Sequence, residues 1–449
     1  MAPHRAGGAE RPDAPAWILA GRAFLRGRLQ PVEIAIGEDG RIQSIGRSRT
    51  GAPRHDVGEA VILPAATDVH VHFREPGPDP RTENLATGTL QAAYGGVGLV
   101  GEMPNTEPPV TDVARLEAKA ARVRGRAAVD VLLYASPSDP TARGRLAERA
   151  GGFKVYLSPT TGIPSVPDPT ELPGLLRELA GLDLPVAVHA EDPAEFTVPE
   201  HLVGPREWDL ARPPSAEAAA LERLASAPAG LRLHVAHVTT AAGADRLRRA
   251  GVSFEATPHH LLLSERTGTD ARFKVNPPLR SEQERAALWS RFCDGTVPLL
   301  ASDHAPHSAS AKDGEFARAP SGMPGVETML PLLLARVRAG DLPLPTLLAA
   351  ACDRPARWLG QAHGRIAPGH RANLLVVDFR ARTPVAAARL HAPCGWTAFE
   401  GWEAIFPREH YRDGRAIVRH GEFEGRLEGE VVRPEFARRP EARPPRSAE

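Results

Sequence analysis

The chain has 449 residues, of which 42% are hydrophobic and 24% are charged, as is ordinary for a globular protein. Its formal net charge is zero, which argues against a nucleic-acid partner, and no stretch reaches the roughly 18 apolar residues of a membrane span. The cysteines Cys293, Cys352 and Cys394 lie far apart, which excludes a disulfide framework and a cysteine-rich zinc site. We therefore expect a cytoplasmic protein that binds neither nucleic acid nor a membrane.

Lysine is unusually rare in this chain. Of the 55 cationic residues only four are lysines, and the other 51 are arginines. Alanine, glycine and proline are also abundant, so this pattern indicates a bias of the whole genome rather than a function. Under such a bias, a lysine that persists is expected to do something that arginine cannot. The four are Lys119, Lys154, Lys274 and Lys312.

Both ends of the chain have the texture of a small β domain. Residues 1–15 and 438–449 are rich in small and charged residues and are expected to be disordered. Short β-like runs separated by turn residues occupy residues 16–62 and return from residue 365. Neither flank could form a good core alone, so we predict that residues 1–63 and 365–449 form one small β-sandwich domain. The runs are Ala16–Ala20, Val32–Ile36, Ala372–Phe379 and Arg415–Val418.

Residues 64–364 alternate apolar runs with amphipathic stretches of helix length, such as Ala114–Arg124, Ala216–Ala225 and Glu282–Phe292. Apolar strands joined by helices form a parallel sheet, and eight such units predict a closed (β/α)8 TIM-like barrel. A doubly wound open sheet is the alternative. No glycine-rich loop follows any run, so no nucleotide cofactor is expected. The first run ends at His72, and the others are Val97–Met103, Val129–Ala135, Gly152–Leu157, Pro185–His189, Leu231–Val238, Val252–Ala256 and Val297–Ala301.

The first run ends in the segment Asp68-Val69-His70-Val71-His72-Phe73-Arg74. Residues two apart point to the same side of a strand, so His70 and His72 share one face. Two imidazoles on one face form half of a metal site, and Arg74 beside them can clamp an anion. An isolated pair of this kind is more often structural, so the interpretation depends on the other strand ends.

Side chains of the metal-ligand type stand at several other strand ends, and the carboxyl ends of barrel strands meet at one face. Packing alone explains such a set poorly. Four histidines and one aspartate could hold two divalent metals if an anion bridged them. A neutral lysine amine can react with CO₂ to give a bridging carbamate, which a guanidinium cannot do. Besides the first pair, the side chains are Asn105, Lys154, His189, His237 and Asp303.

Longer motifs surround these positions. The two most specific are Asp68-x-His70-x-His72-Phe-Arg74-Glu-Pro-Gly and Ala301-Ser-Asp303-His-Ala-Pro-His307 followed by Lys312. Others are Met103-Pro-Asn105-Thr, Val188-His189-Ala-Glu-Asp, Pro258-His-His260, Asn276-Pro-Pro-Leu-Arg280 and Pro324-Gly-Val-Glu-Thr-Met-Leu330. Together they resemble the dihydroorotases of the amidohydrolase superfamily, over about residues 17 to 430. The segment after Lys154 is similar to the branch of that family in which a lysine bridges two metals.

The resemblance implies two zinc ions in each subunit. The ligands would be His70, His72 and Asp303 for one zinc and His189 and His237 for the other, with carboxylated Lys154 bridging them. These residues fill both metal sites. His259, His260 and His304 are therefore expected to be supporting groups outside the metal sites.

The reaction that the resemblance implies is the reversible closure of N-carbamoyl-L-aspartate to L-dihydroorotate and water, in pyrimidine biosynthesis. Asp303 would be the catalytic residue, taking a proton from the attacking water and passing it to the leaving nitrogen. The implied substrate contacts are Arg74, Asn105 and His307 near the carboxylate, Asn276 and the backbone near Gly325 at the ring edge, and Thr160 on a closing loop.

Two other functions remain open at this point. One is a different cyclic amidohydrolase of the allantoinase or hydantoinase type, whose site does not need the same carboxylate clamp. The other is a non-catalytic relative that acts as a scaffold for aspartate carbamoyltransferase, although a scaffold has no need of a complete set of metal ligands. We also expect a homodimer, and a complex of the active enzyme with that transferase is a further expectation.

Overall fold

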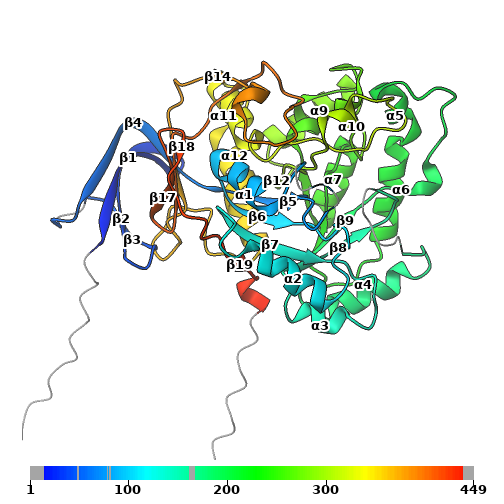
Figure 1. The fold of residues 1–449 in the computed structure, drawn as a ribbon, viewed down its shortest axis with the longest axis horizontal. Helices are drawn as coiled ribbons and strands as arrows, with labels where there is room; N and C mark the ends of the chain where they lie inside the picture. The colour runs from blue at the N-terminus through cyan, green and yellow to red at the C-terminus, as the bar shows by residue number, and fades with distance from the viewer. Residues whose placement is uncertain (1–14, 48–49, 78, 80–81, 161–166, 438–449) are drawn as a thin grey trace, which may run out of the picture.

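The computed structural model describes residues 15–47, 50–77, 79, 82–160 and 167–437. Apart from residue 15, the ends predicted to be disordered lie outside the described residues. Figure 1 shows two parts side by side, a barrel with its helices and a sheet built from both ends of the chain.

Eight parallel strands form a nearly closed barrel, which confirms the predicted fold class and excludes an open doubly wound sheet. Each strand pairs with the next along the chain, and the last is joined to the first by a single bridge between Val71 and His304. The strands are β5 (Ala66–Val71), β6 (Val97–Glu102), β7 (Asp130–Ala135), β8 (Gly152–Tyr156), β9 (Val186–His189), β10 (Leu233–Val235), β11 (Ser253–Ala256) and β12 (Leu299–Leu300).

The inside of the barrel is packed rather than hollow. One apolar cluster takes Val69, Leu99, Leu132, Ala187 and Leu299 from five different strands. A larger cluster lies between the strands and the helices, as expected for strands that are buried on both faces. The polar site described below therefore has a rigid apolar floor.

Helices connect the strands and cover the barrel. Some of them begin at a side chain that satisfies free backbone N–H groups: Asn84 accepts hydrogen bonds from the N–H groups of Ala86 and Thr87 at the start of α1. The helices are α1 (Leu85–Tyr94), α2 (Val113–Val123), α3 (Arg143–Ala147), α4 (Leu172–Ala180), α5 (Pro205–Ala211), α6 (Pro214–Leu224), α7 (Ala241–Ala250), α8 (Pro258–Leu262), α9 (Glu282–Cys293), α10 (Ala309–Lys312), α11 (Met329–Ala339), α12 (Leu344–Leu348) and α13 (Arg354–Trp358).

The second sheet joins strands from both ends of the chain in the order β18-β17-β16-β13-β4-β1-β2-β3. It has its own apolar cluster, which includes Leu19 and Ile34 from one chain end and Leu374 and Tyr411 from the other. Neither end could bury these side chains without the other. The strands are β1 (Trp17–Leu25), β2 (Arg28–Ile36), β3 (Ile42–Ile45), β4 (Arg54–Pro64), β13 (Leu374–Val377), β16 (Glu409–Arg412), β17 (Arg415–Arg419) and β18 (Glu422–Phe423).

The two parts are joined at several points. Strand β4 runs directly into β5 through Ala65. Near the other chain end, the chain leaves the second sheet after β18, and β19 (Val431–Val432) pairs in parallel with β7, a strand of the barrel. Arg371 forms ion pairs with Asp130 at the start of β7 and with Asp413 beyond β16. The small pair β14 (Thr383–Pro384) and β15 (Glu403–Ala404) stands apart.

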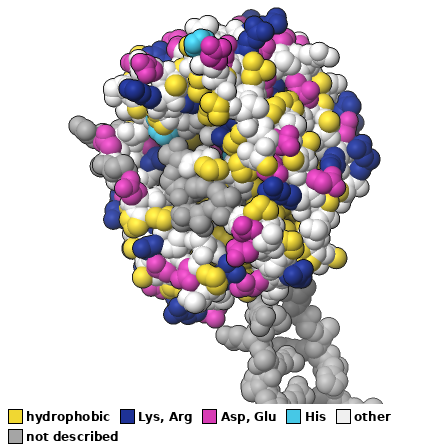
Figure 2. Space-filling model, turned by 90° about the vertical axis from the view of Figure 1, so that its right-hand side faces the viewer, with side chains coloured by type: hydrophobic (Ala, Val, Ile, Leu, Met, Phe, Trp, Pro, Cys, Tyr) yellow, Lys and Arg dark blue, Asp and Glu magenta, His cyan; other side chains and the backbone are white. Residues whose placement is uncertain are grey.

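The surface agrees with the zero net charge. On the face of the barrel shown in Figure 2, acidic and basic side chains are interspersed rather than gathered by sign. Among the described residues, no helix is both long and apolar enough to cross a membrane.

Candidate metal and active site

The predicted ligand side chains meet at the carboxyl ends of the barrel strands. His70 lies on β5 and His72 follows it, while Lys154 lies on β8 and His189 ends β9. The remaining two, His237 and Asp303, lie just beyond β10 and β12. Because parallel strands end at the same edge, segments far apart in the sequence bring these groups together. All six line one buried cavity.

His70, His72 and Asp303 form the tightest group. Their ligand atoms all lie within 4.8 Å of one another, an arrangement that could hold a metal ion. The Nε2 atoms of the two histidines are 3.1 Å apart, and Oδ1 of Asp303 is 3.3 Å from that of His70 and 3.2 Å from that of His72. Imidazole and carboxylate donors in this geometry suit a divalent ion such as zinc.

A second group lies beside the first. Nδ1 of His189 is 2.9 Å from Nε2 of His237, whose ring centroid is 5.4 Å from that of His70. Nζ of Lys154 is 3.3 Å from Nε2 of His70. The lysine nitrogen therefore reaches the first group, and the two groups are close enough to share a bridging ligand.

Buried acceptors behind the histidines set which ring nitrogen faces the cavity. Nδ1 of His70 donates to Oε1 of Glu255 at 2.6 Å, and Nδ1 of His72 donates to Oδ1 of Asn105 at 2.6 Å. The Nε2 atom of each ring then directs its lone pair toward the other metal-ligand atoms in the cavity. Nε2 of His189 is 2.8 Å from Glu191, which leaves Nδ1 free to act as a ligand. Metal-binding histidines are commonly oriented in this way.

Burial holds the imidazoles in the neutral form that binds metal. Burial, helped by nearby Lys154, lowers the pKa of His70 to about 4. Burial and the positive charge of Arg74 lower the pKa of His72 well below its usual value. The pKa of Lys154 also falls, to about 8, because its ammonium is buried. The histidines are therefore neutral near neutral pH, and a larger fraction of Lys154 is neutral than of an exposed lysine.

Three residues of the site have a strained backbone. Arg74, His237 and Asp303 have φ angles of 58°, 38° and 46°, in the left-handed region that residues other than glycine rarely adopt. Such strain persists where the surrounding structure imposes it and is common at functional sites. In each case, the bend follows the end of a strand and turns a charged or ligand side chain toward the cavity.

The cavity around these groups is polar on one side. Of the predicted substrate contacts, Arg74, Asn105, Asn276 and Thr160 line it. The segment that follows Thr160, residues 161–166, lies outside the described residues. Among the described residues, none accepts a hydrogen bond from the buried Nε of Arg74.

The other two predicted contacts, His307 and Gly325, lie next to the cavity rather than in its lining. Nε2 of His307 lies 3.3 Å from Nη2 of Arg74 and 3.0 Å from the carbonyl oxygen of Ser321. The N–H of Gly325 donates to Nδ1 of His304 at 3.0 Å. The structure thus brings four of the six predicted contacts to the cavity itself and places His307 and Gly325 next to residues that form it.

Comparison with known proteins agrees with this geometry. The amidohydrolase family profile matches residues 61–403, which is most of the chain. The chain belongs to the amidohydrolase family. Its relatives include the dihydroorotase of Halobacterium salinarum, 36% identical over 87% of this chain and 93% of its own length. The dihydroorotase of Bacillus caldolyticus is 35% identical over 86% and 94% of the two chains.

Solved structures of other proteins share this fold. The L-hydantoinase (dihydropyrimidinase) from Arthrobacter aurescens has a TM-score of 0.86, at 25% identity, over 93% of this chain and 99% of its own. The dihydropyrimidinase from Brevibacillus agri has a TM-score of 0.83 at 23% identity and covers 94% of this chain. The similarity covers both the barrel and the added sheet, so these proteins share the architecture of this chain.

The three histidines expected outside the metal sites of this amidohydrolase have other contacts. His260 lies between the hydroxyl of Thr257, at 2.8 Å from Nδ1, and the carbonyl of Pro277, at 3.0 Å from Nε2. His304 contacts Glu83 through Nε2 at 3.1 Å. His259 is buried on α8, with its ring beside that of His260.

Several residues of the site were not predicted from the sequence. The cavity of the amidohydrolase also contains Tyr156, Ala305, Ser321 and Gly322. The hydroxyl of Tyr156 is buried there without a hydrogen-bond partner among the described residues. Its position two residues after Lys154 on one strand could have indicated it, because such residues share a face. Ser321 and Gly322 lie on a loop, and no sequence pattern indicated that they belong to the site.

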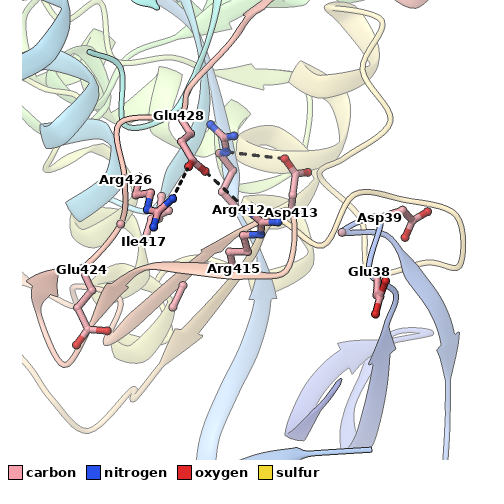
Figure 3. Close-up of a pocket in the computed structure, with 12 residues that line it drawn as sticks. Glu38, Asp39, Arg412, Asp413, Arg415, Ile417, Glu424, Arg426 and Glu428 are labelled. Atoms are coloured by element: carbon pink, nitrogen blue, oxygen red, sulfur yellow. Dashed lines mark ion pairs between the residues drawn. The ribbon is translucent and has the colours of Figure 1, made fainter. Parts of the chain in front are cut away.

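A second depression of the amidohydrolase lies on the sheet formed by the chain ends (Figure 3). Ion pairs occupy part of its lining: Arg415 and Arg426 both pair with Glu428, at 3.8 and 3.9 Å. It lacks the convergence of histidines seen in the barrel. We therefore place the chemistry in the barrel cavity.

Proposed function

We propose that this amidohydrolase is a dihydroorotase, which interconverts N-carbamoyl-L-aspartate and L-dihydroorotate plus water in pyrimidine biosynthesis. Arg74 carries the proposal: its guanidinium lines the cavity beside Asn105, and its buried Nε has no acceptor among the described residues. A guanidinium grips a carboxylate by paired hydrogen bonds. Dihydroorotate carries a carboxylate on its ring, whereas hydantoin and dihydrouracil carry none.

We further propose that the site binds two zinc ions, held by His70, His72 and Asp303 on one side and by His189 and His237 on the other. Bound divalent metal would lower the pKa of water and polarise the ring carbonyl. Lys154 would bridge the ions as a carbamate. Its neutral nitrogen forms a bond to the carbon of CO₂ and releases one proton, which leaves a carboxylate-like pair of oxygens.

The protein groups divide the remaining work. In ring opening, Asp303 would accept a proton from the attacking water and deliver it to the ring nitrogen as the amide bond breaks. Asn105 accepts a hydrogen bond from His72 through its amide oxygen and lines the cavity beside Arg74, where it would contact the substrate. Arg74, supported by His307, would hold the carboxylate and so fix the ring carbonyl near the metals.

A hydantoinase-like activity is the second candidate, because the structure of an L-hydantoinase superposes over nearly the whole chain. The two functions differ in the need for a carboxylate on the ring. Arg74 therefore distinguishes them.

The test is a side-by-side assay of the purified protein on L-dihydroorotate, hydantoin, dihydrouracil and allantoin, with metal analysis. We expect turnover of dihydroorotate in both directions and much slower turnover of the other rings. Arg74→Met should raise KM for dihydroorotate by about 100-fold and leave any hydantoin turnover unchanged, since only the former loses a charge-assisted contact. Hydantoin turnover equal to that of dihydroorotate would overturn the proposal.

We also propose that the enzyme acts as a homodimer and binds aspartate carbamoyltransferase. The support is the similarity to dihydroorotases, and light scattering of the protein alone and mixed with the transferase tests both points. A monomer in the first experiment would contradict the homodimer, and the absence of a larger species in the mixture would contradict the complex.

A further inference from the structure

The four lysines of this chain are all buried. Relative exposure is 0% for Lys119, 1% for Lys154, 4% for Lys274 and 1% for Lys312. Lysine is among the residues least often buried, and this chain uses arginine for 51 of its 55 cations. Lys154 belongs to the site already described, and Lys119 pairs with Glu102 at 2.8 Å. The other two lie together beside the substrate cavity.

Lys312, the last residue of α10, binds three backbone carbonyls at once. Its Nζ donates to the carbonyl oxygens of Ala271 at 2.8 Å, Lys274 at 3.1 Å and Pro320 at 2.8 Å. An ammonium has three N–H donors on one nitrogen, which matches three acceptors around one point. The planar guanidinium of arginine spreads its donors over a larger fork and cannot satisfy acceptors that converge on one atom.

Lys274 completes the arrangement from the opposite side. Its Nζ donates to the carbonyls of Phe316 at 2.8 Å and Ala317 at 2.9 Å. Its own backbone carbonyl accepts from Gly322 at 2.9 Å as well as from Lys312. Residues 271–274 and 316–322 are thus tied together by two ammonium groups and a backbone hydrogen bond. We call this group of contacts the lysine clasp.

The clasp borders the substrate cavity. Ser321 and Gly322, which line the cavity, directly follow the carbonyl of Pro320 that Lys312 holds. Asn276, also a lining residue, is two positions beyond Lys274. The carbonyl of Ser321 lies 3.0 Å from Nε2 of His307, which in turn contacts Arg74. One wall of the cavity is therefore built from loop segments whose relative position depends on the clasp.

We propose that Lys312 and Lys274 are positioning residues, which fix Asn276, Ser321 and Gly322 against the substrate without touching it. The inference rests on the proposed function for the identity of the substrate, but the geometry of the wall does not depend on it. None of the six predicted metal ligands belongs to the clasp. Loss of the clasp should therefore weaken substrate binding while metal content is retained.

The test compares Lys312→Arg, which keeps the charge, and Lys274→Met, which removes it, with the wild type under steady-state conditions. We expect KM for dihydroorotate to rise about 10-fold or more in both variants, with kcat changed less than KM and metal content unchanged. Arg318→Lys is the matched control. It alters a cation of the same segment whose side chain is 86% exposed, and it should leave KM unchanged.

Two results would overturn the inference. One is an unchanged KM in a folded Lys312→Arg or Lys274→Met protein. The other is an equal fall of kcat and metal content in both variants, which would make the clasp a general support of the barrel. If wild-type protein hydrolyses a different cyclic amide, the proposed function fails, and the same variants assayed on that amide still test the clasp.

Discussion

At the scale of single residues, the site is defined as much by what stands behind the histidines as by the histidines themselves. The carboxylate of Glu255 lies between two imidazoles, 2.6 Å from Nδ1 of His70 and 2.9 Å from Nε2 of His234. It fixes His70 in the tautomer whose Nε2 points into the cavity. The free energy of metal binding then includes no cost for choosing that tautomer or orientation.

Replacing this carboxylate tests its role. Glu255→Gln should lower the affinity for zinc by about 10- to 100-fold, because the amide is a weaker acceptor for His70. Competition with a chelator measures this affinity. Glu409→Gln, a buried carboxylate on β16 of the other sheet, is the matched control and should leave it unchanged. Equal affinities in the wild type and Glu255→Gln would show that His70 needs no carboxylate behind it.

The bridge proposed for Lys154 has a test of its own. Lys154→Ala should lose activity and one equivalent of bound metal, because no anion remains between the two groups of donors. A short carboxylic acid added to the variant should restore part of both, since it supplies a carboxylate in the space left by the side chain. Full metal content in the variant without added acid would refute the bridge.

At the scale of elements, the sequence predicted where the strands lie better than where they end. The runs Leu231–Val238 and Val297–Ala301 contain β10 and β12, which are only Leu233–Val235 and Leu299–Leu300. The remaining apolar residues leave the sheet and carry His237 and Asp303 into the cavity. Hydrophobic pattern marks burial and does not distinguish a strand from the bend that follows it.

Strand periodicity could predict site residues on strands, whereas it could not predict those on loops. His70 and His72 were accessible because strand periodicity places them on one face. Ser321 and Gly322 reach the cavity through a loop held by the lysine clasp, and no local pattern encodes such a contact. Glu255 was visible in principle, since an acidic residue inside an apolar run is unusual.

Strand β19 shows how a short element can stabilise a large one. The N–H of Gly429 donates to Ala127 at 2.8 Å, and that of Val131 donates to Glu430 at 2.8 Å. Arg433 donates to the carbonyls of Ala147 and Ala150 at 3.0 and 3.3 Å. The end of the described chain thus fastens the start of β7 and the loop before β8.

Removing this strand should destabilise the barrel. A chain that ends at Glu428 loses the two backbone hydrogen bonds at β7, and at about 1 kcal/mol each the free energy of unfolding should fall by about 2 kcal/mol or more. Urea unfolding measures the change. A chain that ends at Ala437 keeps these contacts and is the control. Identical unfolding of both truncated chains would show that β19 contributes nothing.

At the scale of the whole molecule, the barrel and the terminal sheet share one continuous strand path and one ion-pair network. Arg371 contacts Asp130 in the barrel and Asp413 in the sheet, and the paired carboxylates raise its pKa despite partial burial. The sheet therefore acts as a rigid attachment to the barrel. The site lies at the barrel face, and the first barrel strand, β5, continues directly from β4 of the sheet.

The barrel closes at a short seam, where β5 meets the segment after β12 through the Val71–His304 bridge, the 2.7 Å hydrogen bond from His72 N–H to His304 and the 3.0 Å hydrogen bond from Ser302 N–H to Oδ1 of Asp68. His70 and His72 lie on one side of this seam and Asp303 lies on the other. An ion held by all three would therefore cross-link the first and last strands. Removal of the metal should increase the rate of backbone deuterium uptake at residues 299–304 more than at β7 or β8. An equal change in uptake across all strands would show that the contact between the first and last strands does not depend on the metal.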